Sequence, residues 1–413
     1  MPIELLIDRL MGRVLQIVTV PLLAVFLVSA CTIERPIEPR DDGAKIKGDH
    51  DQLPERQPLP APKPTRVERK LLLFGLDGAD WRLIDPLLEA GRLPNLQRLI
   101  AHGTRAPLKT FKPCLSPLIW TTIATGVGPL VHGISGFTAK LPDGGQEVLV
   151  TSNLRRVEAL WSVASKHDHS AGVIGWWATF PAEEIDGFVI SDQASTLRRE
   201  NYRAALELEN TNSDQQLPTT WPVELATALK EPLTLSARAE PELLDRFLKL
   251  DAKTKRKLLK GAEVDVENIL SIFKFALLID RSFIESGLVA AKQRQPNLTL
   301  LYLNGLDAAE HHFCKYTAPD KFAGVPADEL KRYGKVIDEY YVYMDEVLGR
   351  YLALYDADEL TVVIVSDHGH EANRDYDPKS KDHFDRVCSG THDEAPDGVI
   401  VISGKDVRQG VAL

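Results

Sequence analysis

The sequence contains little cysteine, with four residues in a chain of 413. Small secreted domains that depend on disulfides for their stability use a much larger share, so a disulfide scaffold is excluded. A hydrophobic core must stabilise the fold instead. The length of the chain and its 44% of hydrophobic residues are sufficient for a large globular core.

The sequence also lacks an excess of basic residues. Its 49 Lys and Arg residues stand against 59 Asp and Glu residues, which gives a formal net charge of -10. A general nucleic-acid binder needs a basic surface that neutralises phosphates, so no nucleic acid polymer is expected as a partner. A small phosphate ester stays compatible with this charge, because bound metal cations reverse the local field.

One uncharged, apolar run, Val14 to Ala30, lies near the N-terminus. It ends in Leu27-Val28-Ser29-Ala30-Cys31, which resembles the cleavage box of bacterial lipoproteins. We therefore expect residues 1–30 to be a signal segment and Cys31 to carry a lipid. The protein would then be anchored in the membrane of the bacterial cell envelope and face the periplasm. A plain transmembrane anchor and an ordinary signal peptide are the alternatives.

Residues 31–67 are predicted to form a disordered, proline-rich tether. Few apolar groups are available there to offset the entropy of ordering the chain. The prolines recur among charged residues, at Pro36, Pro39, Pro54, Pro58, Pro60, Pro62 and Pro64.

Short apolar runs after residue 68 predict an α/β fold. Nearly continuous runs are typical of strands buried on both faces of a parallel sheet, and helical patterns separate several of them. The predicted strands are Leu71–Leu76, Ala171–Trp176, Gly187–Ile190, Leu298–Leu303, Thr361–Val365 and Gly398–Ile402. A layered fold with a mostly parallel central sheet is therefore expected.

The range 193–296 interrupts this alternation and is predicted to be an inserted, mainly helical lid. The catalytic core would then comprise residues 68–192 and 297–413. Helical patterns within the insert are Glu240–Leu250, Thr254–Gly261 and Val266–Ala291. A long insertion either shapes substrate choice or is tolerated surface decoration, and the sequence leaves both open.

Acidic residues and histidines gather just beyond the carboxyl ends of the predicted strands. The set is Asp77, Asp307, His311, Asp367, His368 and His392. Open α/β sheets hold their sites at this edge, and only His392 falls in a predicted loop. Carboxylate oxygens combined with imidazole nitrogens suit zinc, with manganese as the alternative.

Ser116 stands just before a predicted helix, and Pro117 suits the first turn of that helix. A helix N-terminus offers free N–H groups and a positive dipole end, which favour a phosphate and a developing alkoxide. Coordination to a metal would activate the hydroxyl as a nucleophile. The alternative role of a serine at this position is the helix N-cap.

Taken in order, these motifs resemble the alkaline phosphatase superfamily. They are Asp77-Gly78, Ser116 with Trp120 and Thr125-Gly126, Pro129 with His132-Gly133-Ile134, Asp307 with His311, Asp367-His368-Gly369, and His392. The sequence is most similar to the branch of type I phosphodiesterases and nucleotide pyrophosphatases, and there to bacterial proteins described as predicted phosphohydrolases or phosphomutases. The resemblance covers residues 70–192 and 297–404.

This resemblance implies metal-dependent hydrolysis of a phosphodiester or phosphomonoester through a phosphoseryl intermediate on Ser116. Two divalent ions would be bound, with zinc expected and manganese as the alternative. One would be held by Asp307, His311 and His392, and the other by Asp77, Asp367, His368 and the Ser116 oxygen. The substrate would be a small-molecule or lipid-linked phosphate ester. Alternatives are a phosphotransferase or phosphomutase of the same superfamily, and an inactive envelope lipoprotein that binds a ligand.

The sequence departs from the family pattern at Phe137. Nucleotide pyrophosphatase-like members carry an asparagine at this position that donates to a phosphate oxygen, so a nucleotide substrate is in doubt. The family core also continues beyond Gly398–Ile402, so whether the chain is truncated at Leu413 stays open. A sulfatase is disfavoured, because the segment around Ser116 lacks the arginine that sulfatases need.

Three further features are weaker predictions. Phe137, Trp176 and Trp177 are candidates for the substrate pocket, with burial in the core as the alternative for the two tryptophans. Cys314 and Cys388 lie close in sequence to His311 and His392, which are expected to converge. The sequence leaves open whether these two cysteines pair in an oxidising compartment.

Overall fold

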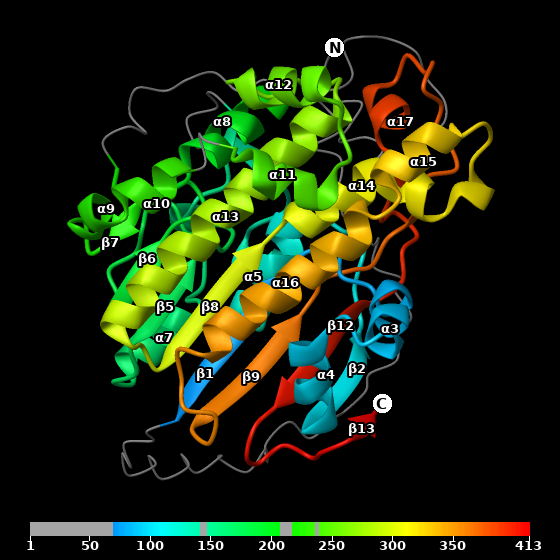
Figure 1. Ribbon diagram of the computed structural model, residues 1–413. Helices are drawn as coiled ribbons and strands as arrows, with labels where there is room; N and C mark the ends of the chain where they lie inside the picture. The colour runs from blue at the N-terminus through cyan, green and yellow to red at the C-terminus, as the bar shows by residue number, and fades with distance from the viewer. Residues whose placement is uncertain (1–68, 141–146, 207–216, 236–238) are drawn as a thin grey trace, which may run out of the picture. The chain divides into compact units, whose positions relative to one another are not determined.

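The computed structural model describes residues 69–140, 147–206, 217–235 and 239–413 (Figure 1). The predicted signal segment, the candidate lipidation residue Cys31 and the predicted tether lie outside these residues. Within the described ranges, no helix combines the length and the apolar character needed to cross a membrane.

A nine-stranded sheet forms the centre of the fold. Its strands are β1 (Lys70–Leu76), β2 (Gly103–Leu108), β5 (Ala171–Ile174), β6 (Gly187–Ile190), β7 (Thr220–Trp221), β8 (Leu298–Leu303), β9 (Leu360–Val365), β12 (Gly398–Ser403) and β13 (Val411–Ala412). Their order across the sheet is β13-β2-β12-β9-β1-β8-β5-β6-β7. All six predicted strands are present, and the α/β fold class is confirmed.

The central strands are parallel, as their apolar sequences predict. Leu72 of β1 pairs with Thr299 on one side and with Val362 on the other. β12 and β7 instead run antiparallel to their neighbours β9 and β6. A short apolar run does not encode the direction of its strand, so the sequence could not predict this mixed character.

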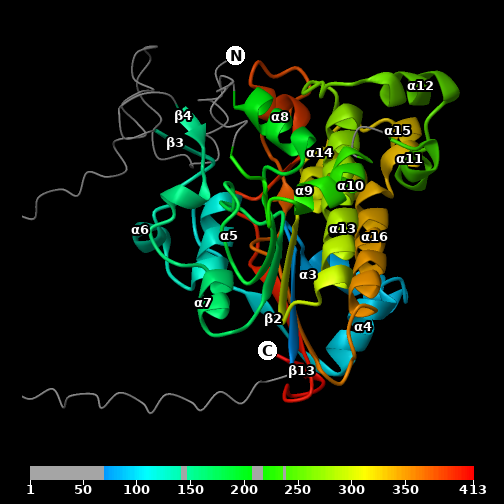
Figure 2. The same cartoon turned by 90° about the vertical axis from the view of Figure 1, so that its left-hand side faces the viewer.

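Helices cover both faces of the sheet, as Figure 2 shows. One face carries α3 (Trp81–Glu89), α4 (Pro94–Ala101), α13 (Ile269–Arg294) and α16 (Val336–Leu352), and the other carries α5 (Ser116–Thr125) and α7 (Leu160–Lys166). Because side chains alternate along a strand, β1 contributes to both layers. Leu72 and Phe74 join one hydrophobic cluster, whereas Leu73 packs with Trp120 and Trp161 in the other.

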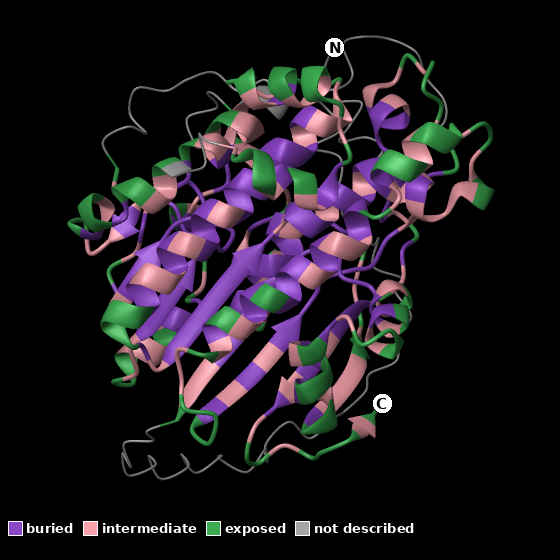
Figure 3. Cartoon of the chain, in the orientation of Figure 1, coloured by how far each residue is buried: buried purple, intermediate pink, exposed green. Residues whose placement is uncertain are grey.

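The predicted insert contains a helix that belongs to the core. Its elements include α8 (Thr196–Ala205), α9 (Leu225–Ala228), α10 (Lys230–Leu235), α11 (Pro241–Phe247), α12 (Ala252–Lys260) and α13. Leu277 and Phe283 of α13 are buried in the same cluster as β1, and Figure 3 shows this helix largely buried along the sheet. The end of the range 193–296 thus covers the sheet, while the proposed division into core and lid stays a prediction.

The remaining elements of the described residues are mostly short. They are α6 (Pro129–His132), β3 (Thr138–Lys140), β4 (Glu147–Leu149), α14 (Gly305–Thr317), α15 (Ala327–Tyr333), β10 (Glu371–Ala372), α17 (His383–Val387), β11 (Gly390–Thr391), and the 3-10 turns Ser152–Leu154 and Pro319–Lys321. β10 and β11 form a small antiparallel ladder in which Glu371 pairs with Thr391. This ladder ties the segment after β9 to the segment that carries His392.

Candidate active site

The sheet order brings the three predicted aspartates together. β9, β1 and β8 are adjacent; Asp77 directly follows β1, Asp367 follows β9, and Asp307 lies in the first turn of α14, which follows β8. Parallel strands end at the same edge, so the three carboxylates meet there.

The first group of candidate ligands is Asp77, Asp367 and His368. All three are buried, and their ligand atoms lie within 4.8 Å of one another. His368 Nε2 is 3.5 Å from Asp77 Oδ1 and 3.3 Å from Asp367 Oδ2. None of these three atoms has a hydrogen-bond partner. A buried polar atom without a partner costs free energy, so this arrangement favours binding of a cation by the three residues.

Neighbouring groups fix the remaining oxygens of this first group. Asp77 Oδ2 accepts a hydrogen bond from Trp120 Nε1 at 3.1 Å and one from the Tyr302 hydroxyl. The Gly78 backbone N–H donates to Asp367 Oδ1 at 3.3 Å. Each carboxylate is therefore held by one oxygen and presents the other toward His368.

The charges of this group also favour a cation. Burial raises the pKa of Asp77 and of Asp367, and the negative charges of nearby carboxylates raise both further. Burial lowers the pKa of His368, which disfavours a positive imidazolium beside them. A divalent cation would supply the positive charge that the side chains do not.

The second group is Asp307, His311 and His392, whose ligand atoms also lie within 4.8 Å of one another. His311 Nδ1 is 2.9 Å from the Gly390 carbonyl oxygen, so it is the protonated nitrogen that donates. This leaves the lone pair of His311 Nε2 directed at the site, 3.5 Å from Asp307 Oδ1. His392 Nδ1 is buried and has no partner.

The β10–β11 ladder explains how His392, a loop residue in sequence, reaches the site. Its imidazole ring centroid lies 4.2 Å from that of His368 and 4.9 Å from that of His311. Gly390 allows the close approach, because a Cβ at this position would lie 2.3 Å from the Glu310 carbonyl oxygen on α14. Burial and the neighbouring imidazoles lower the pKa of His392, so it stays neutral.

These distances test whether the two groups fit metal ions. Ligands about 2.1 Å from a tetrahedral metal lie about 3.4 Å from one another. The imidazole-to-carboxylate distances of 3.3 Å and 3.5 Å in the two groups match that spacing and exceed a good hydrogen bond. Both groups therefore fit a divalent cation such as zinc.

Ser116 begins α5, and Leu115 occupies the N-cap position. The Ser116 hydroxyl is thus not the cap of this helix. Trp120, one turn further on, contacts Asp77 of the first group. Lys112, in the loop before α5, lies with its Nζ 3.3 Å from the carbonyl oxygen of His392, which belongs to the second group. α5 therefore contacts the first group through Trp120, and the loop before it contacts the second group through Lys112.

His370 is a residue of the site that sequence reasoning missed. It is 5% exposed, and its Nε2 lies 2.7 Å from Asp307 Oδ1. The signal was present in the sequence, because Asp367-His368-Gly369-His370 carries a second histidine directly after the recognised motif.

The weaker substrate-pocket candidates have different environments. Trp176 is fully buried and donates from Nε1 to the Trp120 carbonyl oxygen at 3.0 Å, so it lies in the core. Trp177 is 3% exposed and packs edge-on against Phe137 at 5.5 Å between ring centroids. Phe137 also stacks on Tyr202 of α8, at 6.1 Å.

Cys314 and Cys388 are both free thiols in the structure. The Cys388 sulfur lies 3.9 Å from His312 Nδ1. The pairing that the sequence left open is therefore not formed here.

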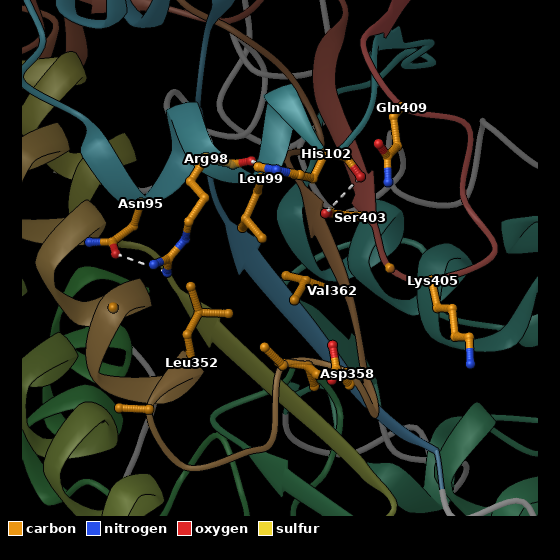
Figure 4. A pocket seen from close by; sticks show the side chains of 15 residues that line it. Asn95, Arg98, Leu99, His102, Leu352, Asp358, Val362, Ser403, Lys405 and Gln409 are labelled. Carbon is orange, nitrogen blue, oxygen red and sulfur yellow. Dashed lines mark hydrogen bonds between the residues drawn. The ribbon is translucent and has the colours of Figure 1, made fainter.

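A cavity of about 950 Å³ lies at the opposite end of the sheet (Figure 4). Its lining includes Leu360, the first residue of β9, whereas Asp367 follows the last residue of that strand. None of the candidate metal ligands lines it. This cavity is therefore separate from the Asp/His site.

The sequence matches the type I phosphodiesterase/nucleotide pyrophosphatase family over residues 71–409. The chain belongs to that family. Membership confirms the resemblance predicted from the motifs, including the assignment to the alkaline phosphatase superfamily. The roles of individual site residues in this family member stay predictions.

Similar solved structures include phosphonoacetate hydrolase from Sinorhizobium meliloti 1021. Its complex with phosphonoformate is 17% identical, with a TM-score of 0.41, and the match covers 74% of this chain and 57% of that chain. Its complex with phosphonoacetate is 18% identical, with a TM-score of 0.38 and the same coverage of 74% and 57%. This family member thus spans little more than half the length of those chains. No curated protein matches the sequence.

Proposed function

We propose that this chain is a metal-dependent phosphoric-ester hydrolase with Ser116 as its nucleophile. The observation that carries the proposal is the pair of Asp/His groups, one of which is contacted by Trp120 of α5 and the other by Lys112 in the loop before it. Within the groups, the imidazole nitrogens and the carboxylate oxygens that face them lie 3.3–3.5 Å apart. In the first group, none of these atoms has a hydrogen-bond partner. Family membership supports the same reaction class.

The residues divide between two cations. Asp307, His311 and His392 would hold one, and Asp77, Asp367 and His368, with the Ser116 oxygen, would hold the other. This donor set favours zinc, with manganese as the alternative. When bound, the cations would supply positive charge that lowers the pKa of the Ser116 hydroxyl and stabilises the leaving-group oxygen.

Ser116 Oγ attacks the phosphorus of the substrate. A bond forms between Oγ and phosphorus while the bond from phosphorus to the leaving alkoxide breaks, and the hydroxyl proton passes to solvent. Water then attacks the phosphoseryl group and releases Ser116 with phosphate or, from a diester, with a phosphomonoester. The positive end of the α5 dipole favours the negative phosphoryl group throughout.

The resemblance places Phe137 where nucleotide pyrophosphatase-like members carry the asparagine that donates to a phosphate oxygen. Support for a replacement comes from Asn304, whose side-chain amide lies 3.4 Å from the Tyr202 hydroxyl next to Phe137. Burial raises the pKa of Tyr202, so this hydroxyl keeps its proton. Asn304 and Tyr202 would donate to the phosphoryl oxygens of a small-molecule or lipid-linked ester.

Hydrolysis of p-nitrophenyl phosphate and bis-p-nitrophenyl phosphate tests the function. Activity should disappear after chelation, return with zinc or manganese, and fall about a thousandfold in Ser116→Ala. Ser162→Ala on α7 is the matched control and should retain activity. Full turnover by Ser116→Ala would remove the nucleophile assignment. A metal-loaded chain that hydrolyses neither ester would favour the phosphotransferase or the ligand-binding alternative.

We also propose that the protein is a lipoprotein facing the periplasm, with Cys31 as the lipidated residue. The support is the sequence Leu27-Val28-Ser29-Ala30-Cys31 at the end of an apolar run. Cys31→Ser should release the protein from the membrane fraction. Unchanged membrane attachment of this variant would exclude the lipid anchor.

A further inference from the structure

His370 adds a fourth imidazole to a site for which three were predicted. Its ring centroid lies 4.6 Å from that of His311 and 5.6 Å from that of His368. Its Nε2 lies 2.7 Å from Asp307 Oδ1, and its Nδ1 is buried without a partner. Asp307, His368 and His370 also form a third group whose ligand atoms lie within 4.8 Å of one another. His370 could therefore be a ligand or a hydrogen-bond donor.

The distances separate these two roles. His311 Nε2 is 3.5 Å from Asp307 Oδ1, close to the spacing of about 3.4 Å between two ligands of one tetrahedral metal. His370 Nε2 is only 2.7 Å from the same oxygen, which is a charge-assisted hydrogen-bond distance and too short for a second ligand. The tautomer with a proton on Nε2 makes this bond, so the nitrogen has no lone pair left for a metal.

The backbone of His370 is fixed from both sides. Its N–H donates to Asp80 Oδ2 at 3.3 Å, and its carbonyl oxygen accepts from the Arg82 guanidinium. Arg82 in turn binds Asp80 through two nitrogens. This pairing clamps the segment directly after the Asp367-His368-Gly369 motif.

The ring itself fits because position 78 is glycine. Gly78 has a φ of +80°, and a Cβ there would lie 3.1 Å from His370 Cδ2 and 3.1 Å from Asp307 Cα. Glu310 closes the other side: its Oε2 is 3.9 Å from His370 Nε2, and its Oε1 accepts from the Tyr341 hydroxyl at 2.8 Å. The imidazole therefore has little freedom to leave Asp307.

We propose that His370 is a positioning residue that orients the Asp307 carboxylate for the cation held with His311 and His392. The inference rests on the proposed function, in which Asp307 is a metal ligand. Hydrogen bonds to ligating groups fix their orientation, and removing such a partner typically costs about 10–100-fold in metal affinity.

Zinc binding to the purified, metal-free chain tests the proposal without any measurement of turnover. His370→Ala removes the donor, His370→Gln restores an N–H near the position of Nε2, and His311→Ala removes a ligand. We expect two zinc equivalents at saturation for wild type and both His370 variants, and one for His311→Ala. The weaker dissociation constant, from competition with a chromophoric chelator, should rise about 10–100-fold in His370→Ala and return to within about threefold in His370→Gln.

Two results would overturn this role for His370. Loss of a whole zinc equivalent in both His370 variants would make the residue a ligand, and wild-type affinity in His370→Ala would make it a bystander. Equal zinc content in His311→Ala and wild type is a different outcome, because it removes the metal site of the proposed function itself. Far-UV circular dichroism checks that each variant is folded before binding is measured.

Discussion

The two ends of the central sheet differ in what they offer a ligand. The carboxyl end has tightly packed Asp and His residues, with buried atoms such as Asp77 Oδ1 and His368 Nε2 that lack partners. The amino end of β9 has a cavity of about 950 Å³, where His102 and Ser403 are joined by a hydrogen bond (Figure 4). This cavity is therefore not where the buried atoms without partners lie.

This difference makes unpaired buried groups, and not cavity volume, the guide to the proposed site. A cavity with satisfied walls costs little to leave filled with water, whereas buried carboxylates without partners require a cation or a proton. Loops at the carboxyl edge of a parallel sheet can also collect residues from several strands, which is why α/β proteins place their chemistry there. The predictions below test this contrast.

The largest expected difference is between two variants, each of which replaces one histidine by alanine at one end of the central sheet. His392→Ala should lower turnover about a thousandfold and remove one zinc equivalent, because it deletes a ligand of the second group. His102→Ala, at the cavity, should keep turnover within about twofold of wild type. Steady-state hydrolysis and metal analysis of both variants measure this. Similar losses in the two variants would contradict the contrast between the ends.

Metal removal should have the next largest effect, this time on stability. Without a cation, the buried carboxylates of Asp77 and Asp367 lie together with no opposite charge to offset them. A ligand at about 100 times its dissociation constant stabilises the native state by about 2.7 kcal/mol. Chelation should therefore lower the melting temperature by about 3–4 °C in a chain of this size. Calorimetry with and without chelator checks this. The melting temperature of His392→Ala should fall less on chelation than that of wild type.

Much of the fold could be predicted because burial on two faces leaves a simple sequence pattern. The runs at Leu71–Leu76 and Leu298–Leu303 are nearly continuous, and both are central parallel strands. The direction of β12 could not be predicted, since it depends on connections across the sheet. Nor could the role of α13, whose pattern fits a lid helix as well as a helix that covers the sheet.

The candidate site could be predicted as far as its residues follow strands or a recognised motif. Asp77 and Asp367 are of this kind. The role of His370 could not be predicted, because it depends on the space left by Gly78 and on the hydrogen bond from Arg82, which only the three-dimensional structure reveals. The stacking of Phe137 on Tyr202 could not be predicted either, because Tyr202 comes from a segment outside the motifs.

A smaller effect is expected from two asparagines at opposite ends of β8. Asn304 follows the strand and reaches toward Tyr202, whereas Asn297 precedes it and accepts from the Ser170 N–H at 3.1 Å. Asn304→Ala should lower kcat/KM about tenfold with zinc content unchanged, since one hydrogen bond to the phosphoryl group is lost. Asn297→Ala should lower the melting temperature but leave kcat/KM within about twofold. If only Asn297→Ala lowered kcat/KM, catalysis would depend on the amino end of β8 and not on Asn304 at its carboxyl end.

The smallest effect should come from Glu267, which joins the predicted insert to α17 near the site. Its carboxylate accepts from Arg386 at 2.7 Å and lies 3.0 Å from His383 Nδ1. Hydrogen bonds from Arg386 lower the pKa of Glu267 from the usual 4.5 to about 2. A lowered pKa in the folded state means that this stabilisation is fully present above pH 4.5 and is lost as the pH falls toward 2.

Because Glu267 is largely exposed, solvent and salt screen its ion pairs. Glu267→Gln should therefore shift the melting temperature at pH 7 by less than about 2 °C, and the difference from wild type should shrink as the pH is lowered below 4.5. Zinc affinity and kcat/KM should stay within about twofold, since Phe384 of α17 packs against His311 and Ile269 packs against the cluster of Phe384, Val387 and Cys388 whether or not Glu267 is charged. A tenfold loss of zinc affinity would instead mean that the insert holds His392 in place, and the carboxyl-end site would then depend on residues far outside its own edge of the sheet.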